Sequence, residues 1–108
     1  MKFKLAFASS DEIVVNQHFG HANKFVIIEI DKEKRTWDVV GVRHNRPVCQ
    51  DGEHTAATME DTCQLLQDCR AVFALRIGQG AMYALAKHYI EAIEEPGLIE
   101  DIVHRIVA

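Results

Sequence analysis

The first half of the chain alternates apolar and polar residues in a way that predicts three strands. Lys2 to Ala8 repeats a large apolar side chain at every second position, which is the period of a strand with one apolar face. After a polar interval, Phe25 to Ile30 is rich in branched residues, and Thr36 to Arg43 is a second extended run beyond the charged turn at Asp31 to Arg35. These two runs predict a hairpin.

The second half predicts helices that alternate with strands. His54 to Gln67 has apolar residues at spacings of three and four, which indicates one apolar stripe on a helix, and Ala71 to Ile77 is a continuous apolar run typical of a buried strand. Beyond it we expect a helix over Ala81 to His88, a short strand over Tyr89 to Ile93, and a final helix opened by Pro96-Gly97.

This order of elements, βββαβαβα, predicts a single α/β domain over residues 1–108. We expect a three-layer domain with a mixed five-stranded sheet and helices on both faces, in the ribonuclease H-like topology. Nucleases of that topology hold magnesium through carboxylates on their strands. The first strand here carries Lys2 and Lys4 and no acidic residue, so we reject a nuclease.

Composition excludes several classes of function. The net charge of −4 and the scattered basic residues argue against nucleic acid as a partner, because such binding requires clustered cations. The apolar stretch from Leu5 to Ala8 is too short for a signal peptide or a membrane span, so we expect a cytoplasmic protein with no membrane partner. No nucleophile with a base and no carboxylate pair can be assembled, so we expect no enzyme activity.

The segment between the first strand and the hairpin contains the best candidate metal ligands. His18 and His21 are three residues apart, a spacing at which two imidazoles can face one ligand. Gly20 between them permits a close backbone approach. The alternative for either histidine is a structural role, as a helix cap or a partner of backbone carbonyls.

Cysteines supply one further candidate ligand. The three cysteines include no CxxC pair, so neither a disulfide framework nor a complete structural zinc site is expected. Cys49 follows Pro47 on a predicted loop, where an accessible thiolate can bind iron. Cys63 lies on the apolar stripe of the predicted helix and is expected in the core. Cys69 could pack or bind, and its place at the entry of the buried strand favours packing.

Two regions favour an anionic guest. Arg43 and Arg46 place positive charge near Cys49. The alternative is that these arginines are exposed and only keep the loop soluble. Gly78 and Gly80 follow the buried strand, where free backbone amides at a helix start can bind an anion. Two glycines after a strand can equally be a tight turn. The longer glycine patterns of nucleotide sites are missing from the sequence.

Several of these segments resemble one family in order along the chain: His18-Phe19-Gly20-His21-Ala22, Val42-Arg43 with Asn45-Arg46-Pro47-Val48-Cys49, Asp68-Cys69-Arg70-Ala71-Val72, and Arg76-Ile77-Gly78. The chain resembles the nitrogenase iron-molybdenum cofactor accessory domain, which occurs in small cofactor carriers and at the carboxyl end of the cofactor-biosynthesis radical enzyme. The resemblance spans nearly all 108 residues.

The resemblance implies a ribonuclease H-like domain that binds the iron-molybdenum cofactor, or its iron-sulfur precursor, as cargo and passes it between cofactor-assembly proteins. It implies His18 and His21 as the prime binding residues, with Cys49 and the arginines of its loop next. The chain lacks the additional helical or radical-enzyme domains of some relatives, which favours a stand-alone carrier or storage protein.

Two other functions stay open. The same fold could serve a regulator or scavenger that binds a single zinc or iron ion through His18, His21 and Cys49. It could also serve a metal-free adaptor in which the histidines are structural.

Overall fold

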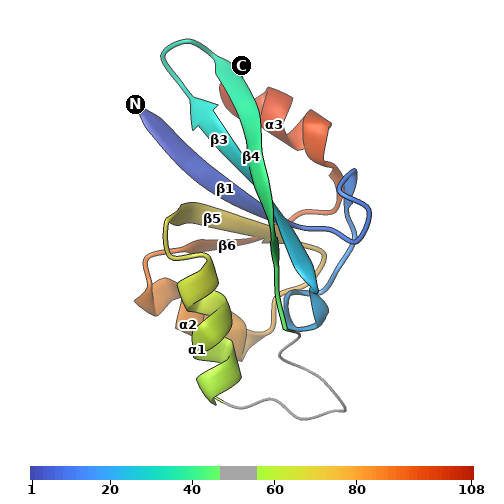
Figure 1. Ribbon diagram of the computed structural model, residues 1–108, viewed down its shortest axis with the longest axis vertical. Coiled ribbons are helices and arrows are strands. Elements are labelled where there is room, and N and C mark those ends of the chain that lie inside the picture. Colours follow the sequence, from blue (N-terminus) through green and yellow to red (C-terminus); the bar gives the residue numbers. More distant parts are fainter. Residues whose placement is uncertain (47–55) are drawn as a thin grey trace.

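The apolar runs of the sequence assemble into a mixed five-stranded sheet in the computed structural model (Figure 1), which describes residues 1–46 and 56–108. Within the described residues the elements are β1 (Lys2–Ala8), β2 (Val14–Val15), the 3₁₀ turn η1 (Phe19–His21), β3 (Lys24–Asp31), β4 (Thr36–His44), α1 (Ala56–Leu65), β5 (Cys69–Ala74), α2 (Gln79–Lys87), β6 (Glu91–Glu94), β7 (Gly97–Leu98) and α3 (Ile99–Val107).

The large sheet has the strand order β4-β3-β1-β5-β6. β1 pairs antiparallel with β3 and parallel with β5, and β5 pairs parallel with β6. The β3–β4 hairpin forms as the alternation predicts. The prediction of an α/β fold with a mixed five-stranded sheet is therefore confirmed.

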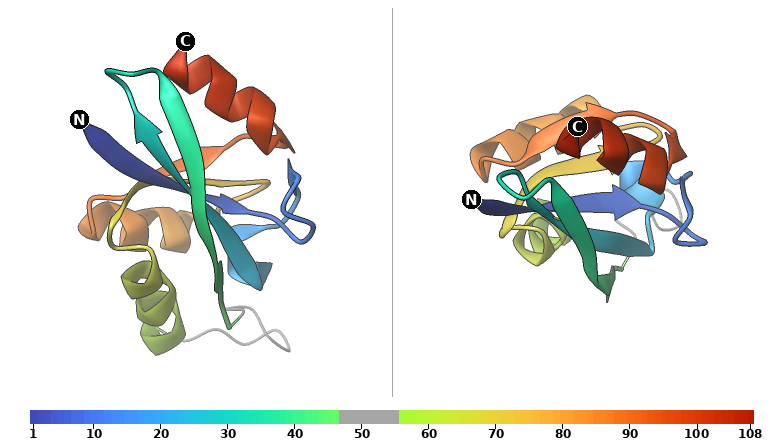
Figure 2. Two further views of the ribbon diagram at one scale, coloured as in Figure 1. Left: turned by 45° about the horizontal axis from the view of Figure 1, so that its top comes forward. Right: turned by 90° about the horizontal axis from the view of Figure 1, so that it is seen from above.

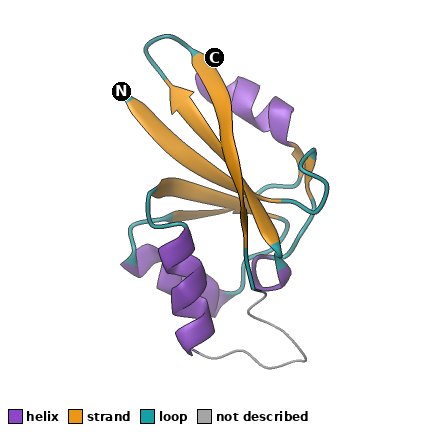
Figure 3. Ribbon diagram, in the orientation of Figure 1, coloured by secondary structure: helices purple, strands orange, loops and turns teal. Residues whose placement is uncertain are grey.

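Helices cover the sheet from both sides because alternate residues of each strand point to opposite faces. One core joins Ala6, Phe25 and Ile27 to buried residues of α1 and α2, including Cys63 and Leu85. The other core lies beneath α3 and is formed by Leu5, Phe7, Val26, Ile28, Ile102 and Val103. Figure 2 shows α3 apart from the other two helices, and Figure 3 shows the strands between the two helical groups.

A second, two-stranded sheet of β2 and β7 is a feature that the sequence did not predict. Pro96-Gly97 does not open the last helix, because Gly97 belongs to β7 and has a φ of 129°, outside the helical range. The helix begins instead at Ile99, whose backbone N–H donates to the carbonyl of Ile13 at 2.9 Å. This ribbon fixes the chain after β1 against the start of α3.

Candidate functional site

The candidate site lies at the carboxyl ends of β1 and β5, which pair parallel within the mixed sheet. Ligands of α/β proteins usually bind beyond the carboxyl ends of parallel strands. The chain after β1 turns back and runs beside the segment after β5. The N–H of Leu75 donates to the carbonyl of Gln17 at 2.9 Å, and the N–H of Phe19 donates to the carbonyl of Arg76 at 2.8 Å. Strand β5 therefore ends at Ala74, earlier than predicted, because Leu75 and Arg76 pair with this segment.

The predicted histidines are brought together on the surface. The rings of His18 and His21 are stacked, with centroids 5.8 Å apart and planes inclined by 26°, and both residues are exposed. Phe19 and Ala22 alternate with them and are fully buried, and the Phe19 ring lies 5.9 Å from that of Phe25. The core therefore anchors the turn while both imidazoles face solvent.

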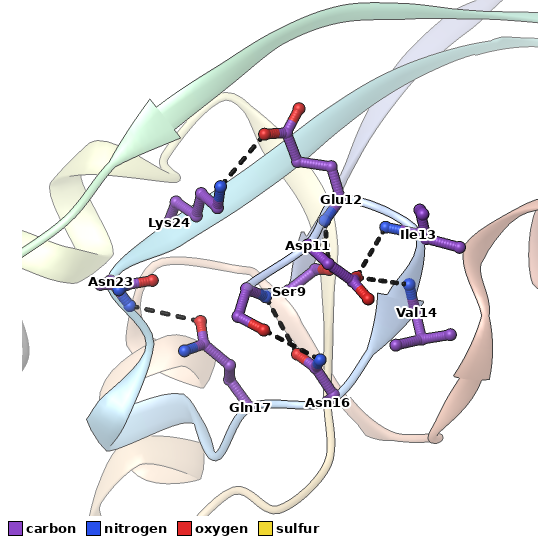
Figure 4. Close-up of polar contacts among 10 residues, drawn as sticks. Ser9, Asp11, Glu12, Ile13, Val14, Asn16, Gln17, Asn23 and Lys24 are labelled. Atoms are coloured by element: carbon purple, nitrogen blue, oxygen red, sulfur yellow. Dashed lines mark hydrogen bonds and ion pairs between the residues drawn. The ribbon is translucent and has the colours of Figure 1, made fainter.

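A network of polar contacts holds the chain that leads into these histidines (Figure 4). The Asp11 carboxylate accepts hydrogen bonds from the amides of Ile13 and Val14, at 2.9 and 3.1 Å, and these bonds lower its pKa. The Asn16 side chain bonds both the amide and the hydroxyl of Ser10. This bonded polar segment leads directly into the histidine segment.

Two side chains that sequence reasoning left without a role hold the far end of this segment. Gln17 accepts a hydrogen bond from the amide of Asn23 at 3.4 Å. Asn45 donates from its side chain to the carbonyl of Ala22 at 3.0 Å, and from its backbone to the carbonyl of Asn23 at 2.8 Å. The Thr62 hydroxyl in turn donates to Asn45 at 3.2 Å. Asn45 belongs to one of the segments that resemble the accessory family, and this was the only feature of the sequence that pointed to a role for it.

The predicted cations differ in how they are engaged. Arg43 forms a bidentate pair with Asp68, at 2.6 and 2.7 Å, and donates to the carbonyl of Leu65 at 2.8 Å. Arg46 is exposed and lines a pocket of about 150 Å³ together with His44, Asn45, Asp61 and Leu65. Arg43 thus holds α1 to the sheet, and Arg46 lies between the end of β4 and α1.

Of the three cysteines, only Cys63 and Cys69 lie in the described part of the chain. Cys49 lies outside the described residues, as do Pro47 and His54. Cys63 and Cys69 are buried, and burial raises the pKa of each thiol to about 11, so both are protonated and poor metal ligands at neutral pH. Within residues 1–46 and 56–108, no three His, Cys, Asp or Glu side chains gather closely enough to hold a metal ion.

The predicted glycine turn lies on the same edge of the sheet. Gly78 precedes the first residue of α2, and Gly80 lies in the first turn of that helix. Both are exposed, and a Cβ at either position would meet nothing within 4 Å. The amide of Ile77 is already bonded to the Glu94 carboxylate at 2.7 Å. The space next to the α-carbons of these two glycines is therefore open.

Together these features define an α/β domain with exposed imidazoles beyond the carboxyl ends of two parallel strands of its sheet. None of the helices in the described parts of the chain is long and apolar enough to cross a membrane. The sequence model of the family described as dinitrogenase iron-molybdenum cofactor matches residues 1–108. The chain belongs to this family of nitrogenase cofactor biosynthesis and accessory proteins.

Individual relatives agree with this assignment. The FeMo cofactor biosynthesis protein NifB of Frankia alni is 36% identical over 108 residues, which cover 96% of this chain and 21% of that protein. Protein NifX of Azotobacter vinelandii is 31% identical over 91 residues, which cover 84% of this chain and 55% of that protein. The chain spans about a fifth of the length of the NifB relatives that it matches.

Solved structures share the fold. The crystal structure of PH0822 has a TM-score of 0.70 at 23% identity and covers 96% of this chain and 88% of that one. An NMR structure from Thermotoga has a TM-score of 0.64 at 18% identity, with 96% and 86% coverage. At these identities the likeness concerns the fold alone.

Proposed function

We propose that this chain binds the iron-molybdenum cofactor, or its iron-sulfur precursor, as cargo during cofactor assembly and performs no turnover. The observation that carries the proposal is the stacked, exposed pair of His18 and His21 on a turn anchored by buried neighbours. A turn fixed in this way loses little conformational entropy when a guest binds. The NifB relatives are named for biosynthesis of this cofactor.

The ligand chemistry fits a cargo that must later be released. Imidazole suits iron, and a carrier with few protein ligands can release a cluster that four cysteines would retain. We propose His18 and His21 as ligands, with Cys49 as a third. Gly20, Gly78 and Gly80 would let the backbone approach the guest. Of the two predicted arginines, Arg46 is the freer to contact it, because Arg43 is bonded to Asp68.

Several properties belong to the same proposal. The partners are proteins of cofactor assembly, because the relatives are named for that process. In this proposal the domain acts as a carrier or storage protein in the cytoplasm. Its order of elements suits the ribonuclease H-like topology, without the acidic cluster of the nucleases.

Metal analysis after anaerobic incubation with the cofactor or its precursor tests the proposal. Several irons with sulfide, with or without molybdenum, support a carrier. One zinc or iron ion per chain would instead support the regulator or scavenger of the same fold. No retained metal would support the adaptor, and either of these two results overturns the proposal.

The variant His21→Ala should take up cluster at least about tenfold less tightly, because it removes one of two stacked imidazoles. Its unfolding temperature should stay close to that of the wild type, because an exposed imidazole contributes little packing. His104→Ala is the matched control, since His104 is an exposed histidine on α3. Unchanged uptake in both His21→Ala and Cys49→Ala would reject the ligand assignment.

A further inference from the structure

We propose that Arg76 is a guest-binding residue that, beside His18, selects anionic metal-sulfide clusters over simple metal cations. This inference rests on the proposed function, since it concerns the same edge of the sheet. From the sequence Arg76 is a cation beside the glycine turn, and the structure adds that it lies next to His18.

The backbone places Arg76 next to His18. The two residues form a parallel bridge, closed by the hydrogen bond from the Phe19 amide to the Arg76 carbonyl at 2.8 Å. Neighbouring residues of extended segments point to opposite sides. Phe19 and Ile77, which follow the two bridge partners, are buried, whereas His18 and Arg76 are exposed. The imidazole and the guanidinium therefore share the solvent-facing side of the bridge.

The charge of Arg76 is available to a guest. Among the described residues, no carboxylate oxygen lies within 4.0 Å of its guanidinium, whereas Arg43 pairs with Asp68 at 2.6 Å and Arg105 pairs with Glu95 at 3.1 Å. The carboxylate of Glu94 bonds the amide of Ile77. Arg76 is thus a cation beside the imidazole pair that the described part of the chain does not neutralise.

The chemistry of guanidinium explains the selectivity. It is planar, always charged and weakly hydrated, and its several N–H groups can donate in parallel to one anion, which suits the sulfides and diffuse negative charge of a cluster. A fixed positive charge beside two imidazoles repels a divalent cation. His18 and Arg76 together therefore favour a guest that accepts a nitrogen ligand and is itself negatively charged.

Tetrathiomolybdate, a small anionic metal sulfide, is the probe, with its dissociation constant measured anaerobically by titration calorimetry at several salt concentrations. Arg76→Gln should bind it about three- to tenfold more weakly, with a smaller salt dependence, because one cationic contact is lost. Arg76→Lys should keep most of the affinity. The matched control is Arg35→Gln, which removes an equal charge at the β3–β4 turn, at the opposite end of the molecule from η1 (Figure 1).

A zinc titration separates charge selection from a structural role. Arg76→Gln should bind zinc as well as the wild type or more tightly, because the repelling charge is gone. Equal weakening toward zinc and tetrathiomolybdate would overturn the inference, and so would equal losses in Arg76→Gln and Arg35→Gln. A wild-type protein that does not bind tetrathiomolybdate would overturn it as well.

The inference and the proposed function fail in different ways. If the chain takes up cofactor through His18 and His21 but Arg76→Gln behaves as Arg35→Gln does, the cargo proposal stands and the role of Arg76 is rejected. If Arg76 selects the anion but the chain retains no cofactor or precursor, the role of Arg76 stands and the cargo proposal is rejected.

Discussion

Single polar side chains determine where the histidine turn lies, and Asn45 is the most connected of them. It bonds the carbonyl of Ala22 and accepts a bond from Thr62 of α1, while its own amide bonds the carbonyl of Asn23. The residue thus joins the end of β4, the histidine turn and a helix. The buried Phe19 anchors the histidine turn in the core, and Asn45 ties the end of that turn to β4.

Asn45→Ala should lower the free energy of unfolding by about 1–3 kcal/mol, because two side-chain hydrogen bonds are lost and a carbonyl is left unpaired. Denaturant titration measures this loss. Asn23→Ala is the control, since only the backbone of Asn23 makes hydrogen bonds among the described residues. Cluster uptake by Asn45→Ala should weaken, while Asn23→Ala should match the wild type. Equal stability of the two variants would contradict the role of Asn45.

At the scale of elements, the pair of Arg43 and Asp68 joins β4 to the end of α1. Arg43 donates to the carbonyl of Leu65, the last residue of α1, which places a cation at the negative end of the helix dipole. Its hydrogen bonds hold the pKa of Asp68 at about 2, below the usual value of about 3.9 for an aspartate. Lys4 lies 3.8 Å from the same carboxylate.

The sign of this pKa shift predicts a pH dependence of stability. A carboxylate with a lowered pKa in the folded state stabilises the protein above its unfolded pKa, and the contribution is lost as the pH falls from about 4 through about 2. Asp68→Asn should therefore lose about 1 kcal/mol at pH 7, a small value because the pair is partly exposed, and almost nothing near pH 2. Asp61→Asn, an exposed position on α1, is the control. A constant difference across that range would contradict the assignment.

At the scale of the whole molecule, the sequence predicted those elements that have a local apolar pattern. The five strands of the large sheet and the three helices have such patterns, for example the alternation in Lys2–Ala8 and the continuous apolar run that contains most of β5. The β2–β7 ribbon was missed because two-residue strands have no period and depend on pairing with a distant segment. For the same reason the neighbour of His18, Arg76, could not be predicted, since only the parallel bridge brings them together. The adjacency of His18 and His21 could be predicted, because it depends only on their spacing of three residues along the chain.

The two cores on opposite faces of the sheet predict that stability and guest binding can be changed separately. Ile102→Ala, beneath α3, should cost about 2–5 kcal/mol in the free energy of unfolding, because Ile102 is 2% exposed and its removal leaves a cavity. Below its unfolding temperature this variant should take up cluster as the wild type does. Ile13→Ala, at an exposed residue, is the control and should change stability by less than about 0.5 kcal/mol. A loss of uptake in the folded Ile102→Ala protein would show that the two faces are coupled.

The alternation within His18-Phe19-Gly20-His21-Ala22 has a consequence for redesign. Because the buried positions and the exposed histidines interleave in one short stretch, either imidazole can be exchanged for a thiol or a carboxylate without repacking the interior. The stretch is therefore a ready platform for engineering proteins of altered metal preference. Substitutions at Phe19 would abolish that platform by removing its anchor.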